Sequence, residues 1–149
     1  MAAAKVLQPE DPTQIPSIMI DVLKDGRLVE TITLENNAVF KLGRHSQTEN
    51  FVHLMHESIS MMHAALVLDE HKGLLLIDLG SKYGTKLNGK QIEPNIPTPV
   101  NKKGDIVQFG ASTRSYKITV DYSRMLAAQM KALKELEEEV DQLAELDRD

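Results

Sequence analysis

Short apolar segments alternate with polar turns at regular intervals through most of this chain of 149 residues. The turns include Asp25-Gly26 and Asn88-Gly89, and the second pair is typical of a two-residue hairpin because both positions accept a positive φ. Segments that recur about every 8–12 residues, with no helical period between them, predict an all-β fold, an antiparallel β-sandwich. The predicted strands cover residues 18–23, 28–34, 39–43, 63–68, 74–79, 85–87, 90–92, 105–109 and 116–120.

The end of the chain has a different pattern, which predicts a C-terminal α-helix. Residues 122–146 contain no Gly or Pro, and Asp121 or Ser123 can cap the start of a helix there. Either this acidic amphipathic helix folds back on the sandwich, or it forms a short coiled coil that makes a homodimer or docks on a partner. Gln129 interrupts the coiled-coil seam and Glu137-Glu138-Glu139 would repel one another. Apolar residues occupy the remaining seam positions: Leu126, Leu133, Leu136, Val140 and Leu143.

These patterns divide the chain into three parts. Residues 1–16 contain three prolines and few apolar residues, so they predict an irregular N-terminal leader. Residues 17–120 hold the strands of one domain, and residues 121–149 hold the helix. Residues 1–120 carry 13 basic and 13 acidic residues, whereas residues 121–149 carry 4 and 9, so the whole net charge of −5 lies in the tail.

Composition excludes several classes of function. Without cysteine the chain has no disulfide and no thiolate metal site, and a reducing, intracellular compartment is expected. No apolar run reaches the length of a signal peptide or a membrane span, which predicts no membrane partner. A neutral domain with an acidic tail lacks the clustered basic surface that nucleic acid requires. The expected partner is therefore another protein.

Two segments carry residues that suit capture of a phosphate group. Arg44 follows Gly43 at the end of a predicted strand, and a guanidinium held there presents a fork of N–H donors to phosphate oxygens. Ser60 lies just before the strand predicted from His63, where its hydroxyl and its backbone N–H are expected to point at the same anion. Lys82, in the loop after Leu79, adds a mobile positive charge.

These residues, in this order, resemble the forkhead-associated (FHA) domain, and the strand pattern extends the resemblance over residues 17–120. Residues 92–94 and 109–116 are further similar to the FHA subgroup of nuclear phosphatase-inhibitor and splicing-associated proteins. The resemblance implies a sandwich of about eleven strands that binds phosphothreonine in an extended or disordered segment of a partner. The motifs that carry it are Gly43-Arg44, Ser60-x-x-His63, Ser81-x-x-Gly84-Thr85 and Asn88-Gly89.

The resemblance also implies a role for each of these positions. Arg44, Ser60 and Lys82 would contact the phosphate, and His63 would be a buried structural residue that braces the loops. Met61 and Tyr83 depart from the family pattern, since a polar or basic residue and an asparagine are usual there. Together with Ser81, these two are the candidates for contact with the peptide. The other structural positions are Gly43, Gly84, Thr85, Asn88 and Gly89.

The function expected from these features is that of a phosphothreonine-dependent adaptor, with its helix, residues 122–146, for dimerisation or partner docking. The alternative is a phosphorylation-independent scaffold that uses the same fold and the helix. The subgroup resemblance favours the nucleus over the cytoplasm, although no Lys/Arg run long enough for a nuclear localisation signal is present.

Catalysis, cofactors and metals are not expected. Ser60 and His63 are three residues apart, but a buried His63 at the start of a strand is not placed to act as a base. The chain has no P-loop, kinase signature or nucleophile elbow. Its five histidines include the pair His53-x-x-His56, which has ligand-like spacing, but no cysteine accompanies it to complete a zinc site.

Overall fold

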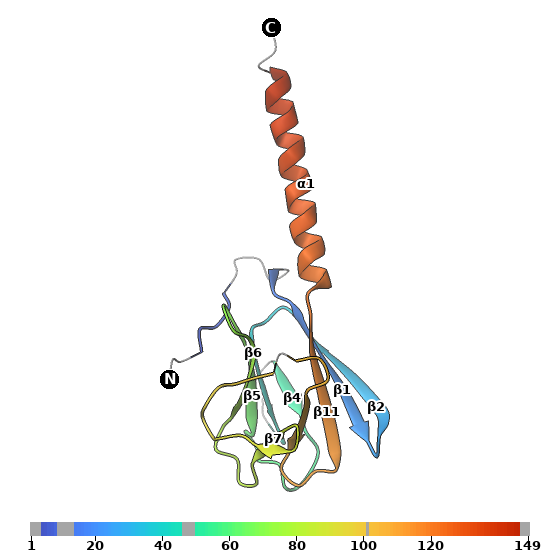
Figure 1. Cartoon of the computed structure of the whole chain (residues 1–149), viewed down its shortest axis with the longest axis vertical. Helices are drawn as coiled ribbons and strands as arrows, with labels where there is room; N and C mark the ends of the chain where they lie inside the picture. The colour runs from blue at the N-terminus through green and yellow to red at the C-terminus, as the bar shows by residue number, and fades with distance from the viewer. Residues whose placement is uncertain (1–3, 9–13, 46–49, 101, 147–149) are drawn as a thin grey trace.

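The computed structural model describes residues 4–8, 14–45, 50–100 and 102–146, and it contains two packed β-sheets followed by one long helix (Figure 1). The elements in chain order are β1 (Ser17–Lys24), β2 (Arg27–Leu34), β3 (Val39–Gly43), β4 (Phe51–His53), β5 (Ala64–Asp69), β6 (Gly73–Asp78), β7 (Thr85–Leu87), β8 (Lys90–Gln91), β9 (Thr98–Pro99), β10 (Ile106–Phe109), β11 (Arg114–Asp121) and α1 (Ser123–Leu146).

The eleven strands confirm the predicted sandwich. One sheet has the order β2-β1-β11-β10-β7-β8, and the other has the order β4-β3-β5-β6-β9. The two turns that the sequence singled out join β1 to β2 and β7 to β8. Asp25, Gly26, Asn88 and Gly89 all have positive φ, between 52° and 82°, which gives these two-residue turns the right-handed twist of the strands they connect.

The pairing differs from the expectation in one respect, because β4 runs parallel to β3. Lys41 lies opposite Phe51 and Gly43 lies opposite His53 in this pair, whereas all the other paired strands of the two sheets are antiparallel. Neither β4 nor β9 was predicted as a strand. With three residues in β4 and two in β9, these strands are too short for an apolar–polar alternation to be recognised. Pro99 is typical of an edge strand, and β9 lies at the edge of its sheet.

The core lies between the two sheets and follows the period of two that a strand imposes. In β1, Ile18, Ile20 and Val22 are at most 1% exposed. In β10, Val107 and Phe109 are fully buried in the same way. Burial of side chains of this kind stabilises the folded state by about 1.5–3 kcal/mol each, so packing between the two sheets is a main source of stability.

Register places the loops at two opposite ends of the sandwich. Leu42 pairs with Ala64 and Ala64 pairs with Asp78, so the end of β3, the start of β5 and the end of β6 meet at one end, here called the pocket end. Gly73, at the start of β6, lies at the other end. There β11 finishes and α1 begins, and we call it the helix end (Figure 1).

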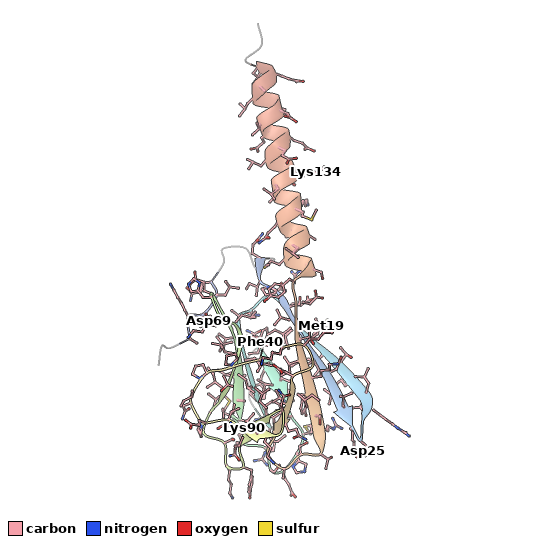
Figure 2. The ribbon with its side chains drawn as sticks, viewed as in Figure 1. Met19, Asp25, Phe40, Asp69, Lys90 and Lys134 are labelled. Carbon is pink, nitrogen blue, oxygen red and sulfur yellow. The ribbon has the colours of Figure 1, made fainter. Side chains whose placement is uncertain are left out.

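The helix projects from the helix end and does not fold back on the sandwich (Figures 1 and 2). None of its residues is buried, so of the two alternatives left open for the helix, packing on the sandwich is not found. The Asp121 carboxylate accepts hydrogen bonds from the backbone N–H and the hydroxyl of Ser123, which satisfies one backbone group at the helix start. Arg124 forms an ion pair with Glu35 at 3.4 Å, a contact between the base of α1 and the loop after β2.

Part of the segment predicted as an irregular leader pairs with β5. Leu7 N–H donates to the Leu68 carbonyl, and the N–H of Lys5 donates to the Asp69 carboxylate at 2.7 Å. Residues 1–3 and 9–13 of that leader, and 147–149 of the predicted tail, lie outside the described residues. Within the described part of the chain, no helix is both long enough and apolar enough to cross a bilayer.

Candidate functional site

Three loops at the pocket end surround one open cavity of about 330 Å³. Arg44 directly follows β3, Ser60 belongs to the loop before β5, and Lys82 belongs to the loop between β6 and β7. The three predicted phosphate contacts, distant in sequence, therefore line the same cavity. The lining residues are Arg44, Glu57, Ser58, Ile59, Ser60, Met61, Lys82 and Tyr83.

Gly43 allows the first two loops to approach each other. A Cβ atom at this position would lie 2.2 Å from the carbonyl oxygen of Met61, a distance that no side chain tolerates. The close approach permits the Arg44 N–H to donate to the Ser60 carbonyl at 3.1 Å and the His63 N–H to donate to the Leu42 carbonyl at 2.9 Å. Gly43 thus sets the separation of Arg44 from Ser60.

His63 lies beneath the loops and is hydrogen-bonded to two of them. Its ring is fully buried, its Nδ1 accepts the backbone N–H of Ser60 at 3.1 Å, and its Nε2 donates to the Gly84 carbonyl at 2.9 Å. Burial lowers the pKa of His63, against the opposing effects of the Gly84 carbonyl and the Asp78 carboxylate. The ring is therefore neutral, with its proton on Nε2, and it links the loop of Ser60 to the loop of Lys82.

The hydrogen bonds of Ser60 orient its hydroxyl as a donor. The hydroxyl oxygen accepts the backbone N–H of Lys82 at 3.1 Å, so its own proton is free to bond an acceptor in the cavity. The expectation that the Ser60 backbone N–H also points at the anion is wrong, because that N–H is bonded to His63. Ser60 offers one donor to a ligand, not two.

Positive charge exceeds negative charge around the cavity. Arg44 and Lys82 are exposed cations, and Glu57 is the one carboxylate among the lining residues. No carboxylate of the residues described lies within 4.0 Å of the Arg44 guanidinium, so its donors face solvent. The ammonium of Lys82 lies over the Tyr83 ring, 5.3 Å from its centre, which fits a weak cation–π contact.

Asp78 holds the third loop in shape. Its carboxylate is 1% exposed and accepts hydrogen bonds from the backbone N–H groups of Gly80 and Ser81 and from the hydroxyls of Ser81 and Thr85. Burial would raise the pKa of Asp78, but these hydrogen bonds outweigh it and the pKa lies below its usual value. Since the Ser81 hydroxyl also accepts the Gly84 N–H, both of its hydrogen-bonding roles are used inside the loop, which leaves Ser81 less suited to peptide contact.

The two positions that depart from the family pattern form the rim of the cavity. Met61 is 51% exposed and Tyr83 is 54% exposed, on opposite loops. Both side chains present apolar surface beside the cationic groups. They remain the candidates for contact with peptide residues next to a phosphate.

Ser58 is a positioning residue that the sequence did not reveal. Its hydroxyl accepts the Ala111 N–H at 2.8 Å and donates to His56 Nδ1, which ties the loop of Ser60 to the turn after β10. Gly110 in that turn has no room for a Cβ, which would lie 2.7 Å from the Ser58 hydroxyl. A serine in a loop gives no sequence signal of such a distant contact.

Asn88 and Gly89 shape the β7–β8 hairpin rather than the cavity. The Asn88 side chain donates to Asp105 at 3.0 Å and accepts the Ile106 N–H at 2.9 Å. Thr85 starts β7, as the resemblance implied. Gly84 is held at φ +84°, and a Cβ there would overlap the Gln91 side chain.

The histidine pair with ligand-like spacing has other contacts. His56 is bonded to Ser58, and the His53 ring packs edge-on against Phe51 at 5.0 Å. Across residues 4–8, 14–45, 50–100 and 102–146, no three His, Asp or Glu side chains are grouped to hold a metal ion.

Comparison with known proteins agrees with this geometry. The sequence profile of the FHA domain matches residues 40–110. The nuclear inhibitor of protein phosphatase 1 of Homo sapiens is 36% identical over 104 residues, which are 69% of this chain and 29% of that protein. The Smad nuclear-interacting protein 1 of Mus musculus is 29% identical over 105 residues, 62% of this chain and 27% of that protein. This chain thus spans less than a third of the length of these curated relatives.

Solved structures share the fold. The solution structure of the FHA domain of TbPar42 is 34% identical, with a TM-score of 0.56, over 76% of this chain and 64% of that one. The chain is an FHA-domain protein, and FHA domains are protein-interaction modules that generally bind phosphothreonine. Both of these curated relatives bear names that describe them as nuclear proteins.

Proposed function

We propose that this chain is an adaptor that captures a phosphothreonine-containing segment of a partner protein in the cavity between Arg44, Ser60 and Lys82. The observation that carries the proposal is the convergence of three donors on one cavity in which the guanidinium has no carboxylate partner among the described residues. A phosphothreonine carries a charge of about −1.5 to −2 and three strong acceptor oxygens. Its oxygens match the fork of Arg44, the hydroxyl of Ser60 and the point charge of Lys82.

The arrangement supports binding rather than catalysis. His63 is buried, and both its ring nitrogens are hydrogen-bonded to backbone groups, so it has no position from which to accept a proton from Ser60. A hydroxyl without a base is a weak nucleophile but a good phosphate donor.

The exposed helix supports a second contact, either with another copy of the chain or with a partner. Its apolar seam is solvent-exposed over the whole length of α1, which suits an interaction surface. The nuclear relatives favour the nucleus as the place of action. A scaffold that binds independently of phosphorylation is the alternative, favoured by the apolar rim of Met61 and Tyr83.

A phosphothreonine peptide library tests the proposal. Peptides selected by the wild type should bind Arg44→Ala and Ser60→Ala about 10- to 150-fold more weakly, since each loses a charge-assisted bond of about 1.5–3 kcal/mol. Lys86→Ala, which removes an exposed cation of β7 outside the cavity, is the matched control and should bind like the wild type. Equal binding of phosphorylated and unphosphorylated peptides would contradict the phosphothreonine-dependent adaptor and favour the phosphorylation-independent scaffold.

A further inference from the structure

The charges of α1 are divided between its two halves. Residues 123–134 contain Arg124, Lys131 and Lys134 and no acidic residue, whereas residues 135–146 contain six acidic residues and no basic one. The first turn therefore lacks acidic residues and the last turn lacks basic ones, which is the opposite of what the macrodipole of an isolated helix favours. A parallel copy would align like charges, whereas an antiparallel copy would align unlike charges.

The seam of exposed apolar residues fits the antiparallel arrangement. When two copies of α1 cross head to tail about a point between residues 134 and 135, Leu126 faces Leu143 of a second copy and Leu133 faces Leu136 of a second copy. In each layer of the coil, a residue at one of the two apolar heptad positions of one helix then faces a residue at the other position of the second helix, as in antiparallel coiled coils. The glutamates at 137–139 then lie level with residues 130–132 of the second copy, which include Lys131, and not against each other.

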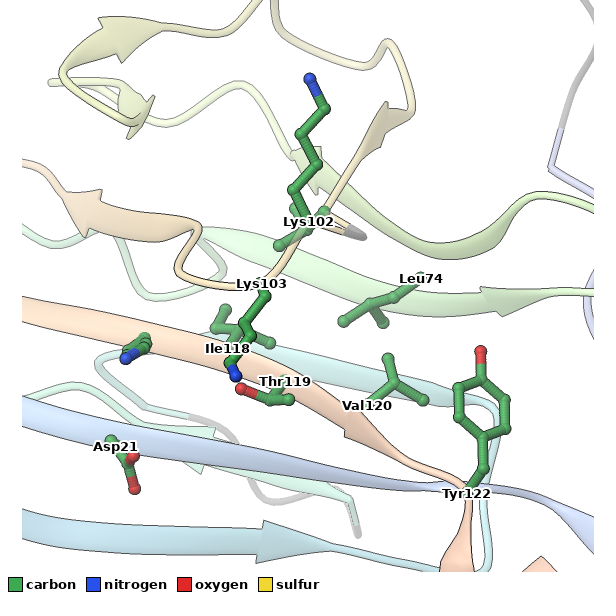
Figure 3. A pocket seen from close by; sticks show the side chains of 10 residues that line it. Asp21, Leu74, Lys102, Lys103, Ile118, Thr119, Val120 and Tyr122 are labelled. Atoms are coloured by element: carbon green, nitrogen blue, oxygen red, sulfur yellow. The ribbon is translucent and has the colours of Figure 1, made fainter. Parts of the chain in front are cut away.

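A groove at the helix end completes the surface. It has a volume of about 410 Å³ and lies beside Tyr122, the residue that precedes α1 (Figure 3). Its floor is apolar, with Leu74 and Val120, and its charged wall includes Lys102 and Lys103, both exposed. In the antiparallel register the last turn of a second copy, with Glu145 and Leu146, arrives level with the start of α1, next to this groove.

We infer that the chain forms an antiparallel homodimer through α1, in which the acidic end of each helix docks beside the lysine-lined groove at the base of the other. The groove and the phosphate cavity lie at opposite ends of the sandwich. The two cavities of the dimer therefore face away from each other, separated by two sandwiches and a helix of about 36 Å. Such a dimer links two phosphorylated segments on different molecules.

Disulfide trapping tests the orientation, because the chain has no cysteine of its own. Leu126→Cys and Leu143→Cys, mixed in equal amounts and oxidised, should give the mixed disulfide dimer, and each variant alone should stay largely unlinked. In an antiparallel pair the two copies of position 126 are about 25 Å apart, far beyond the Cα separation of a disulfide. Efficient self-linking of either variant, without the mixed product, would establish a parallel coil and overturn the inference.

Sedimentation equilibrium of the full chain tests the groove. The wild type should be a dimer, and Lys102→Glu/Lys103→Glu should weaken dimerisation about 3- to 30-fold, while Lys24→Glu/Lys90→Glu, on exposed lysines elsewhere, should not. A wild-type chain that stays monomeric, or equal effects of the two double variants, would overturn the inference. The variant Lys102→Glu/Lys103→Glu should bind phosphopeptide as tightly as the wild type. A failure of the dimer inference can therefore be told apart from a failure of the proposed phosphate binding.

Discussion

Replacement of Gly43 by alanine is the sharpest test of how the fold brings Arg44 and Ser60 together. The added Cβ would lie 2.2 Å from the Met61 carbonyl oxygen and 2.8 Å from its carbon. Carbon–oxygen contacts settle near 3.3 Å, so β3 and the loop before β5 must separate by about 1 Å. This movement stretches the bonds from Arg44 N–H to Ser60 and from His63 N–H to Leu42, which are 3.1 and 2.9 Å long.

The expected cost follows from these two effects. Overpacking of a rigid contact costs about 1–3 kcal/mol, and each of two weakened hydrogen bonds contributes about 0.5–1 kcal/mol. Gly43→Ala should therefore lower the free energy of unfolding by about 2–5 kcal/mol in urea denaturation followed by circular dichroism. Under conditions where the variant is folded, phosphopeptide affinity should fall as well.

Gly26→Ala provides the control. Gly26 has a positive φ but no atom near its absent Cβ, so this variant should lose only about 1 kcal/mol, the cost of the backbone conformation. If Gly43→Ala stays within about 0.5 kcal/mol of the wild type and binds phosphopeptide normally, then the close packing of β3 against the loop does not set the site, and the reasoning is refuted.

Substitutions at three further residues probe the loops. Asp78→Asn should lower the free energy of unfolding in urea by about 3 kcal/mol, because an amide cannot accept all the hydrogen bonds that the carboxylate receives. An unchanged urea midpoint would show that these hydrogen bonds do not stabilise the domain. Because the pKa of His63 is lowered in the folded chain, the unfolded chain takes up a proton first as the pH falls below about 6.5. The free energy of unfolding of the wild type should therefore drop by up to about 1.4 kcal/mol per pH unit below that pH. His63→Gln should lack this contribution, and the same dependence of stability on pH in the variant and the wild type would contradict it. Tyr83→Ala and Tyr83→Asn should each bind phosphopeptide more weakly by calorimetry if the ring contacts the ligand, and wild-type affinity in both would exclude that role.

The sequence predicted the local features of this protein well. Hairpins with Asp25-Gly26 and Asn88-Gly89 follow from backbone preferences of adjacent residues, and the alternation in β1 follows from the pleat of a strand. The motif residues could be located in the sequence because Gly43-Arg44 and Ser60-x-x-His63 are each recognised from neighbouring residues at a fixed spacing. What these residues bond to depends on contacts between distant loops.

Those distant contacts account for what the sequence did not predict. The donor role of the Ser60 hydroxyl depends on the Lys82 N–H, and the anchoring of the loop depends on Ser58 and the Ala111 N–H, 53 residues away. The periodicity of α1 establishes that an apolar face exists but not what covers it, so the helix was equally compatible with packing on the sandwich. The strand β4 is too short for any periodicity, and its parallel pairing requires knowledge of the register.

Isothermal titration of one peptide in two forms tests the central claim most directly. A peptide selected from the phosphothreonine library is measured against the wild-type chain with its threonine phosphorylated and unphosphorylated. We predict micromolar binding of the phosphorylated form and loss of binding for the unphosphorylated form, and we expect Arg44→Ala to bind the phosphorylated form about 10- to 150-fold more weakly than the wild type. Equal affinities for the two peptides, or full affinity without the guanidinium, would contradict the proposal that this cavity recognises phosphate.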